Sequence, residues 1–333
     1  MDCSSVVERP IAPAAPLVRL PLVTLYLTER CNSRCVSCDY WRHGGRDIDI
    51  DTVKQLLPGL DELGTQAVLI SGGEPLMHPR WAEIAGLLRG HGRRLWLLTA
   101  GLALAKQAAE VARLFERVTV SLDGSNAASY AAIRGRDAFE VVCAGIRAVV
   151  RAGAQVSLRV TVQRGNAGEL PALVKLAHEL GVMQLSFLAA DVAHAEAFGR
   201  HGAPHDGVAL EAQDLPVLSR ALDTLAREHA QDFASGFIAE SPAKLRRIEA
   251  HYRARLGLGD PPPVRCNAPE FSAVVEADGG LRPCFFVAGA SRLGEEGLAH
   301  ALNAQPQRRL RATIAAGRRP ECRHCVCSKW FVA

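Results

Sequence analysis

Three cysteines near the start of the chain have a spacing that can hold one metal cluster. The segment Cys31-Asn-Ser-Arg-Cys35-Val-Ser-Cys38 places three thiols within eight residues. Thiolates are the usual ligands of iron–sulfur clusters. Three of them can bind three corners of a cubane, which leaves the fourth iron open for another ligand. A closed structural zinc site needs four ligands, so the triad favours a cluster over the alternatives of zinc ligands or free cysteines.

A second group of cysteines lies near the end of the chain. Cys266 and Cys284 flank a predicted β-hairpin, and Cys322, Cys325 and Cys327 follow. This pattern brings four thiolates together from two segments. A four-cysteine zinc site is the alternative to a second cluster, because C-x₂-C is also a zinc spacing.

The elements that must position the first group alternate between strand and helix. Apolar, β-branched runs predict strands, and the stretches between them have a helical period. The predicted strands are 22–28, 67–71, 95–99, 118–122, 155–163 and 183–188. The predicted helices are 51–63 (with Asp51 as N-cap), 79–88, 103–114, 126–133, 139–152 and 169–180. Six such units predict an α/β fold, a partial (β/α)6 barrel whose ligands bind at the carboxyl ends of parallel strands.

The remaining residues predict two further parts of the chain. Residues 189–208 predict a long solvated loop that lines the substrate cavity; its His194, His201 and His205 match no standard metal spacing. Helices are expected over 215–229, 242–255 and 306–316, and a hairpin over 272–286. The predicted organisation is an irregular lead-in (1–19), the barrel (20–190), a helical extension (191–260) and a small α+β cluster-binding module (261–333).

Further motifs follow the later strands, at the end of the sheet where the cysteine triad is expected. They are Ser71-Gly72-Gly73-Glu74-Pro75, Thr99-Ala100-Gly101, Ser121-Leu122-Asp123-Gly124 and Ile133-Arg134-Gly135, with Arg159 on the fifth strand. C-x₃-C-x₂-C after the first strand, followed by these motifs, resembles the radical S-adenosylmethionine (SAM) superfamily. The resemblance implies a [4Fe–4S] cluster whose open iron chelates SAM. Reductive cleavage of SAM then yields a 5′-deoxyadenosyl radical that abstracts a hydrogen from an unactivated C–H of the substrate.

The same resemblance implies which residues contact SAM. The set is Gly72, Gly73, Glu74, Pro75, Thr99, Ser121, Asp123, Arg134 and Arg159. Glu74 would accept from the α-ammonium and Arg159 would pair with the carboxylate, with a structural ion pair as the alternative for Arg159. Relatives usually have an aromatic residue before the third cysteine, where this chain has Ser37. Tyr40 and Trp41 are the candidates to replace that ring, with packing as their alternative role.

The second cysteine group resembles the auxiliary-cluster module called SPASM, or twitch in its short form. Five cysteines instead of seven favour the twitch form with one auxiliary [4Fe–4S] cluster. The implied ligands are Cys266, Cys284, Cys322 and Cys325. Cys327 is then a substitute ligand, a hydrogen-atom donor to a substrate radical, or inert, while Cys143 is expected in the core and Cys3 in the N-terminal tail.

Composition excludes several other classes of protein. The formal charge of +4 is small and the basic residues are scattered, which argues against nucleic-acid binding. No apolar run reaches the ~18 residues of a membrane span, and the N-terminus lacks the pattern of a signal peptide, so we expect a cytoplasmic protein.

The resemblance leaves several reactions open. We expect oxidation or epimerisation of a small, sugar- or aminocyclitol-like molecule, with electrons from a reductant protein such as flavodoxin or ferredoxin. Only about 20 residues precede the first strand, which disfavours a peptide-leader-binding domain. A maturase of ribosomally made peptides is the alternative enzyme. A non-catalytic zinc or iron–sulfur redox or scaffold protein is the alternative of another class.

Overall fold

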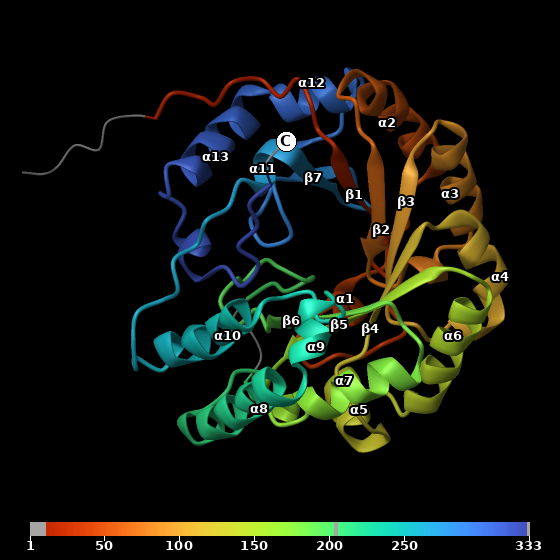
Figure 1. Ribbon diagram of the computed structural model, residues 1–333. Coiled ribbons are helices and arrows are strands. Elements are labelled where there is room, and N and C mark those ends of the chain that lie inside the picture. The colour runs from red at the N-terminus through yellow and green to blue at the C-terminus, as the bar shows by residue number, and fades with distance from the viewer. Residues whose placement is uncertain (1–10, 203–205, 332–333) are drawn as a thin grey trace, which may run out of the picture.

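The partial barrel is built on a parallel sheet. The structure, a computed structural model, describes residues 11–202 and 206–331. Its first six strands are β1 (Leu22–Thr28), β2 (Ala67–Gly72), β3 (Arg94–Thr99), β4 (Arg117–Ser121), β5 (Gln155–Val162) and β6 (Gln184–Ala189). Each pairs in parallel with its neighbour, so all six carboxyl ends meet on one side (Figure 1). This confirms the predicted partial barrel.

Helices cover the outer face of these strands. They are α2 (Ile50–Glu62), α3 (Trp81–Gly90), α4 (Leu104–Leu114), α5 (Ala127–Arg134), α6 (Phe139–Arg151) and α7 (Leu170–Glu179). Their apolar stripes are buried against the sheet, and Cys143 lies in this core as predicted. The N-cap of α2 is Asp49 and not Asp51, because the Asp49 side chain accepts from the Asp51 amide and Ile50 already faces the core.

The C-terminal hairpin extends the same sheet, which the sequence did not predict. The hairpin strands β7 (Ser272–Val275) and β8 (Gly280–Arg282) are antiparallel, and β7 also pairs in parallel with β1. Within the described residues the strand order is β6-β5-β4-β3-β2-β1-β7-β8-β9, where β9 is Ser291–Arg292. The second hairpin strand ends at Arg282 instead of residue 286, since Pro283 has no N–H to donate.

The other elements close the molecule around this sheet. They are α1 (Tyr40–His43), α8 (Leu215–Glu228), α9 (Ala230–Ala234), α10 (Pro242–Arg255), α11 (Ala268–Phe271), α12 (Gly297–Asn303) and α13 (Gln305–Ala315). The C-terminal α12 packs on α2, close to Gly59 (Figure 1). Residues 11–19 of the lead-in form no helix or strand, and the Leu17 amide donates to Asn303 Oδ1 at 2.7 Å. No helix among the described residues is long and apolar enough to cross a membrane.

Candidate active site

The cysteine triad lines one cavity at the carboxyl ends of the strands. Cys31, Cys35 and Cys38 lie in the loop between β1 and α1 and share this cavity, which encloses about 1190 Å³ including its open mouth. Phe198 has a positive φ of 57°, and its carbonyl accepts from the Cys38 thiol at 3.3 Å. The long loop after β6 therefore forms part of the same site.

The surroundings of the thiols fit ligands of a negatively charged cluster. Backbone amides of Ser33 and Tyr40 donate to the sulfurs of Cys31 and Cys38. Burial nevertheless raises the pKa of each of these two thiols to about 12, and the Arg134 guanidinium opposes that rise. Thiolates in this cavity therefore need the positive charge of bound iron to be stable. The amide donors and the nearby cation suit the sulfurs of an iron–sulfur cluster.

The end of α5 holds the cysteine loop in place. The amides of Arg34 and Val36 donate to the carbonyls of Arg134 and Ile133 at 2.9 and 3.0 Å. Gly135 ends the helix with φ at +64°, and a Cβ there would lie 2.3 Å from the Arg34 carbonyl oxygen. Only glycine therefore allows this close contact between α5 and the loop.

Six of the predicted SAM-contacting residues line the same cavity as the triad. They are Gly72, Gly73, Thr99, Ser121, Arg134 and Arg159. Gly73 comes so close to the β1 loop that a Cβ would lie 2.3 Å from the carbonyl oxygen of Arg30. Residues 157, 159 and 161 alternate along β5 with buried apolar residues, and so face the interior of the barrel. The parallel strands thus bring these motifs together as predicted.

Glu74 and Pro75 do not line this cavity. Glu74 is fully buried, and its carboxylate accepts from Thr99 Oγ1 at 2.8 Å and from the amides of Ala100 (2.6 Å) and Leu76 (3.1 Å). These bonds tie the end of β2 to the end of β3, while Pro75 begins the short helix that follows. The structure thus gives Glu74 a positioning role in place of the predicted direct contact with the SAM ammonium.

Asp123 is likewise a structural partner. Its carboxylate pairs with Arg134 at 3.1 Å and accepts from the Thr161 amide at 2.7 Å. Arg134 also donates to the Ser121 carbonyl at 3.0 Å. The pair therefore fixes the ends of β4 and β5, and Arg134 alone of the two reaches the cavity.

Tyr40 faces away from the triad's cavity, so the prediction that it replaces an adenine-stacking ring is wrong. Its ring packs edge-on against Tyr26 at 6.0 Å and lines a separate polar pocket with Glu276 and Arg282. Trp41 Nε1 donates to the Cys35 carbonyl at 3.3 Å, so this side chain has a structural role in the cysteine loop. The aromatic rings that do line the cavity are Phe198, Phe285 and Phe286. The sequence offered no spacing signal for them, since they come from two distant loops.

The second cysteine group gathers beside the first cavity. Cys266, Cys284, Cys325 and Cys327 line the interior space of the barrel, and Cys322 lies near enough to Cys284 and Cys266 for their charges to influence its pKa. Backbone amides donate to three of the sulfurs, at Cys266, Cys284 and Cys325. Such N–H···S bonds stabilise thiolate ligands. Cys327 lines both this space and the cavity of the triad.

In the described part of the chain, the cysteine sulfurs are not arranged around one common metal position. Among the residues that the structure describes, no three His, Cys, Asp or Glu side chains converge on one metal position. A cubane binds each thiolate through a different iron, so it does not require such convergence. Cys3 and His205 lie outside the described residues.

A buried network connects the segments that carry the two cysteine groups. Asp191, directly after β6, pairs with His194 at 2.5 Å and with Arg200. His194 Nε2 lies 2.9 Å from the Glu321 carbonyl, next to Cys322, and Arg200 donates to the Ser37 carbonyl at 3.2 Å, next to Cys38. His194 is 2% exposed. The predicted solvated position of His194 is therefore wrong, whereas His201 is exposed.

Comparison with known proteins agrees with this geometry. Residues 25–177 match the Radical SAM superfamily. The chain contains a radical SAM domain over these residues. Enzymes of this superfamily use a [4Fe–4S] cluster and SAM, and they need a reductant.

The curated proteins similar to this chain are named for different reactions. An "AdoMet-dependent heme synthase" of Methanosarcina barkeri is 32% identical over 168 residues, covering 49% of this chain and 48% of the relative. A "PqqA peptide cyclase" of Methylobacterium sp. is 32% identical over 179 residues, covering 52% and 46%. The chain thus spans about half the length of the curated relatives it matches.

The fold resembles that of solved radical SAM enzymes. Streptococcus suis SuiB bound to the precursor peptide SuiA superposes with a TM-score of 0.63 at 13% identity, covering 87% of this chain and 66% of SuiB. At this identity the likeness concerns the fold alone.

Proposed function

We propose that this chain is an active radical SAM enzyme whose cluster is held by Cys31, Cys35 and Cys38. The supporting observation is the single cavity that joins these thiols to the strand-end residues Ser121 and Arg159. When bound, the cluster and SAM supply a 5′-deoxyadenosyl radical that abstracts a hydrogen atom from an unactivated C–H. Ser121 and Arg159 orient SAM, and the Phe198, Phe285 and Phe286 side chains exclude water from the radical.

The same proposal includes a second cluster and a reductant. Cys266, Cys284, Cys322 and Cys325 would hold an auxiliary [4Fe–4S] cluster, and flavodoxin or ferredoxin in the cytoplasm would supply electrons. Oxidation or epimerisation is the proposed outcome, because an auxiliary cluster can accept an electron and Cys327 can return a hydrogen atom. The cavity position of Cys327 supports its role as hydrogen donor over that of substitute ligand.

Two substrate classes remain within this proposal. The first is a small molecule, sugar- or aminocyclitol-like. The second is a ribosomally made peptide, which is favoured by the similarity to a "PqqA peptide cyclase" and by the likeness in fold to SuiB, solved with a precursor peptide.

Anaerobic reconstitution with iron and sulfide tests the core of the proposal. We expect about eight irons per chain from two cubanes, and 5′-deoxyadenosine from SAM under reduction. Cys31→Ala/Cys35→Ala/Cys38→Ala should lose about four irons and all 5′-deoxyadenosine. Cys322→Ala/Cys325→Ala should lose the other four but still cleave SAM. Bound zinc, or a cluster without SAM cleavage, would favour the non-catalytic redox or scaffold protein.

Cys327→Ala serves as the matched variant for the hydrogen-donor role. It should keep about eight irons and cleave SAM as the wild type does. In deuterated water, a thiol donor would add deuterium to an epimerised product, and the variant would not. Deuterium transfer from labelled candidate substrates into 5′-deoxyadenosine would identify the substrate itself.

A further inference from the structure

The cavity of the cysteine triad continues into a side chamber between the barrel and α10. Arg159, Cys327 and Lys329 line both spaces. Lys244, Arg247 and His251 of α10 line the side chamber but not the cavity of the triad, as does Glu240 just before that helix. The chamber is therefore next to the proposed site of radical chemistry, on the side of the residue we assign as a hydrogen donor.

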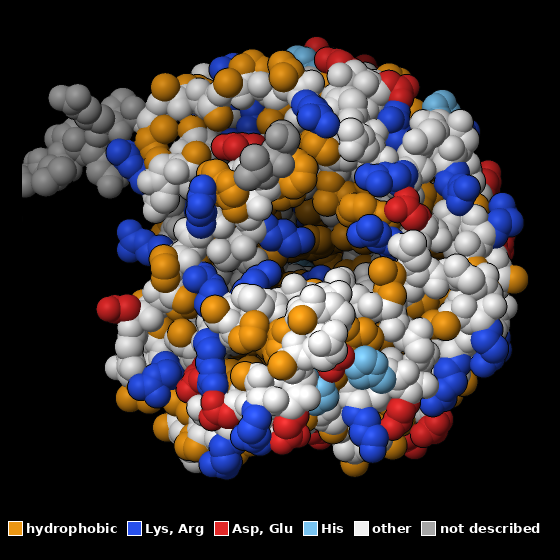
Figure 2. All heavy atoms as spheres, in the orientation of Figure 1, with side chains coloured by type: hydrophobic (Ala, Val, Ile, Leu, Met, Phe, Trp, Pro, Cys, Tyr) orange, Lys and Arg blue, Asp and Glu red, His pale blue; other side chains and the backbone are white. Residues whose placement is uncertain are grey.

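Positive charge predominates on the walls of the side chamber. Arg159, Lys244, Arg247 and Lys329 provide four cationic groups, and Glu240 is the one carboxylate among its lining residues. Burial raises the pKa of Glu240, whose carboxylate already accepts from the Phe187 amide at 2.9 Å. Among the described residues, neither Lys244 nor Lys329 has a carboxylate within 4.0 Å. The chamber therefore has an excess of positive charge, of which Glu240 offsets a part through Lys244 and Arg159. Figure 2 shows Lys and Arg side chains around an apolar hollow on the face it displays.

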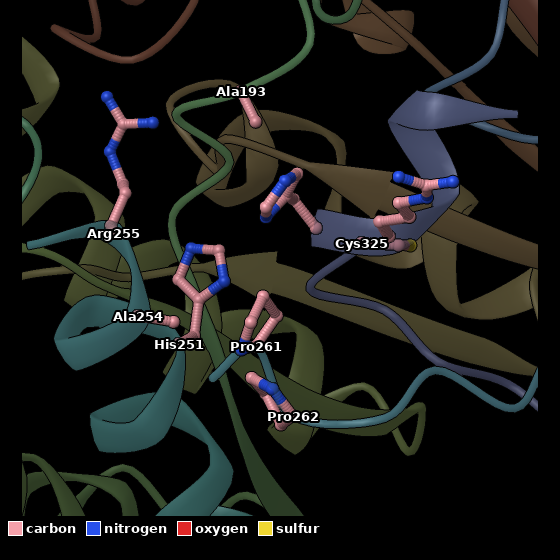
Figure 3. Close-up of a pocket in the computed structure, with 9 residues that line it drawn as sticks. Ala193, His251, Ala254, Arg255, Pro261, Pro262 and Cys325 are labelled. Atoms are coloured by element: carbon pink, nitrogen blue, oxygen red, sulfur yellow. The ribbon is translucent and has the colours of Figure 1, made fainter. Parts of the chain in front are cut away.

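Two buried nitrogen atoms in the chamber have no hydrogen-bond partner among the described residues. They are Arg159 Nε and His251 Nε2. His251 is 8% exposed and lies with Cys325 around a small pocket beside the chamber (Figure 3). Burial and the charge of Arg255 lower its pKa to about 4, so the ring is neutral at pH 7. An unpaired buried polar group is destabilising, and a ligand with acceptor atoms would provide the missing partner.

We propose that the side chamber binds an anionic oxygen group of the substrate, a carboxylate or a phosphate. Lys244 and Lys329 pair with its oxygens, and His251 donates a hydrogen bond to one of them from Nε2. The proposal rests on the proposed function for the identity of the main cavity, and it specifies the substrate class of that site. It favours acidic sugars, sugar phosphates or acidic peptide groups, and disfavours aminocyclitols, whose ammonium groups would be repelled.

Binding of simple anions to the reconstituted, SAM-saturated enzyme tests this proposal. Isothermal titration calorimetry at low salt would use inorganic phosphate, glutarate and, as a neutral control, glutaramide. We expect at least one of the two anions to bind and glutaramide not to bind. Lys244→Gln and Lys329→Gln should each weaken anion binding about tenfold, which corresponds to ~1.4 kcal/mol. Lys106→Gln, an exposed lysine on α4, is the matched control and should bind as the wild type does.

The outcomes separate the two sources of negative charge and the two proposals. Binding of phosphate alone indicates a phosphorylated substrate, and binding of glutarate alone indicates a carboxylate. The inference is overturned if the wild type binds neither anion, or if both lysine variants bind like Lys106→Gln. Titrations repeated without SAM, with 5′-deoxyadenosine assayed in parallel, distinguish this failure from failure of the proposed function, which appears as absent SAM cleavage.

Discussion

At the residue scale, Glu74 shows that the carboxylate of a sequence motif can support a site without lining its cavity. It has no exposed surface, and its three donors are Thr99 and Ala100 at the end of β3 and Leu76 in the short helix after β2. Burial raises its pKa, and the hydrogen bonds oppose that rise. We therefore propose that Glu74 supports the site by fixing the ends of β2 and β3, without contacting SAM.

Glu74→Gln should destabilise the fold for this reason. The amide has one acceptor oxygen in place of two, so one buried donor loses its partner at a cost of about 1–3 kcal/mol. Urea unfolding would measure the change. Glu83→Gln, which breaks an exposed pair with Arg80, is the control and should cost under about 1 kcal/mol. Unchanged stability with weaker SAM binding would instead indicate a direct contact with the ammonium group.

At the scale of elements, the site depends on contacts between loops and helix ends. The C-terminus of α5 accepts the amides of the cysteine loop, and Gly135 permits that approach. The Asp191 network then joins this loop to the C-terminal segment. Each cysteine group is therefore held by an element from elsewhere in the chain.

Gly135→Ala should displace the cysteine loop. Its Cβ would lie 2.3 Å from the Arg34 carbonyl oxygen, and the added strain of a positive φ costs about 1 kcal/mol. Gly153→Ala is the matched control, since Gly153 also has a positive φ but no atom within 4 Å of the added Cβ. We expect both variants to lose some stability and only Gly135→Ala to lose iron from the first cluster. Equal iron content in the two variants would contradict the proposed contact.

Asp191→Asn should affect both cysteine groups. The substitution leaves Arg200 and His194 buried without their carboxylate, which costs about 3–5 kcal/mol. Because these side chains contact the carbonyls beside Cys38 and Cys322, electron paramagnetic resonance signals of both reduced clusters should change. Asp232→Asn, which removes an Asp–His pair at the surface, should change neither signal. A change in only one signal would show that the network does not link the two groups.

At the scale of the whole molecule, the C-terminal residues extend the sheet of the partial barrel beyond β1. Strand β7 covers the edge of β1, with Leu22 opposite Ser272 and Leu25 opposite Val275. Strands from early and late parts of the sequence thus lie side by side in one sheet (Figure 1). An uncovered, apolar β1 edge would be a template for aggregation.

Truncation after Asp260 tests this dependence. The shortened chain keeps the first cysteine group but loses β7 and the helices that pack on α2. We expect it to aggregate or to unfold at lower denaturant concentration, as measured by size-exclusion chromatography and urea titration. The full-length Cys322→Ala/Cys325→Ala variant is the control, since it removes cluster ligands but keeps β7. A soluble truncated protein of wild-type stability would show that residues 261–333 form a separable domain.

The sequence by itself determined the parts of this protein that depend on local order along the chain. Hydrophobic period set the six strands and their helices, and parallel connection then required the motifs after each strand to meet at one edge. The cysteine spacing can be read directly from the sequence, whereas the residues at 72, 73, 99, 121, 134 and 159 were predicted from the resemblance to the radical SAM superfamily. Asp191 could have been found in the same way, since it directly follows the last strand of the series.

Only the tertiary structure decided which side chains reach the cavity. Glu74 and Tyr40 follow the expected motifs. In the folded chain, however, Glu74 is buried behind the cavity wall and Tyr40 lines a different pocket. His194, Phe285 and Lys329 lie in loops with no period to mark them, and distant segments bring them together. The pairing of β7 with β1 also lacked a local signal. Such contacts depend on the free energy of packing the whole chain, which residue spacing does not encode.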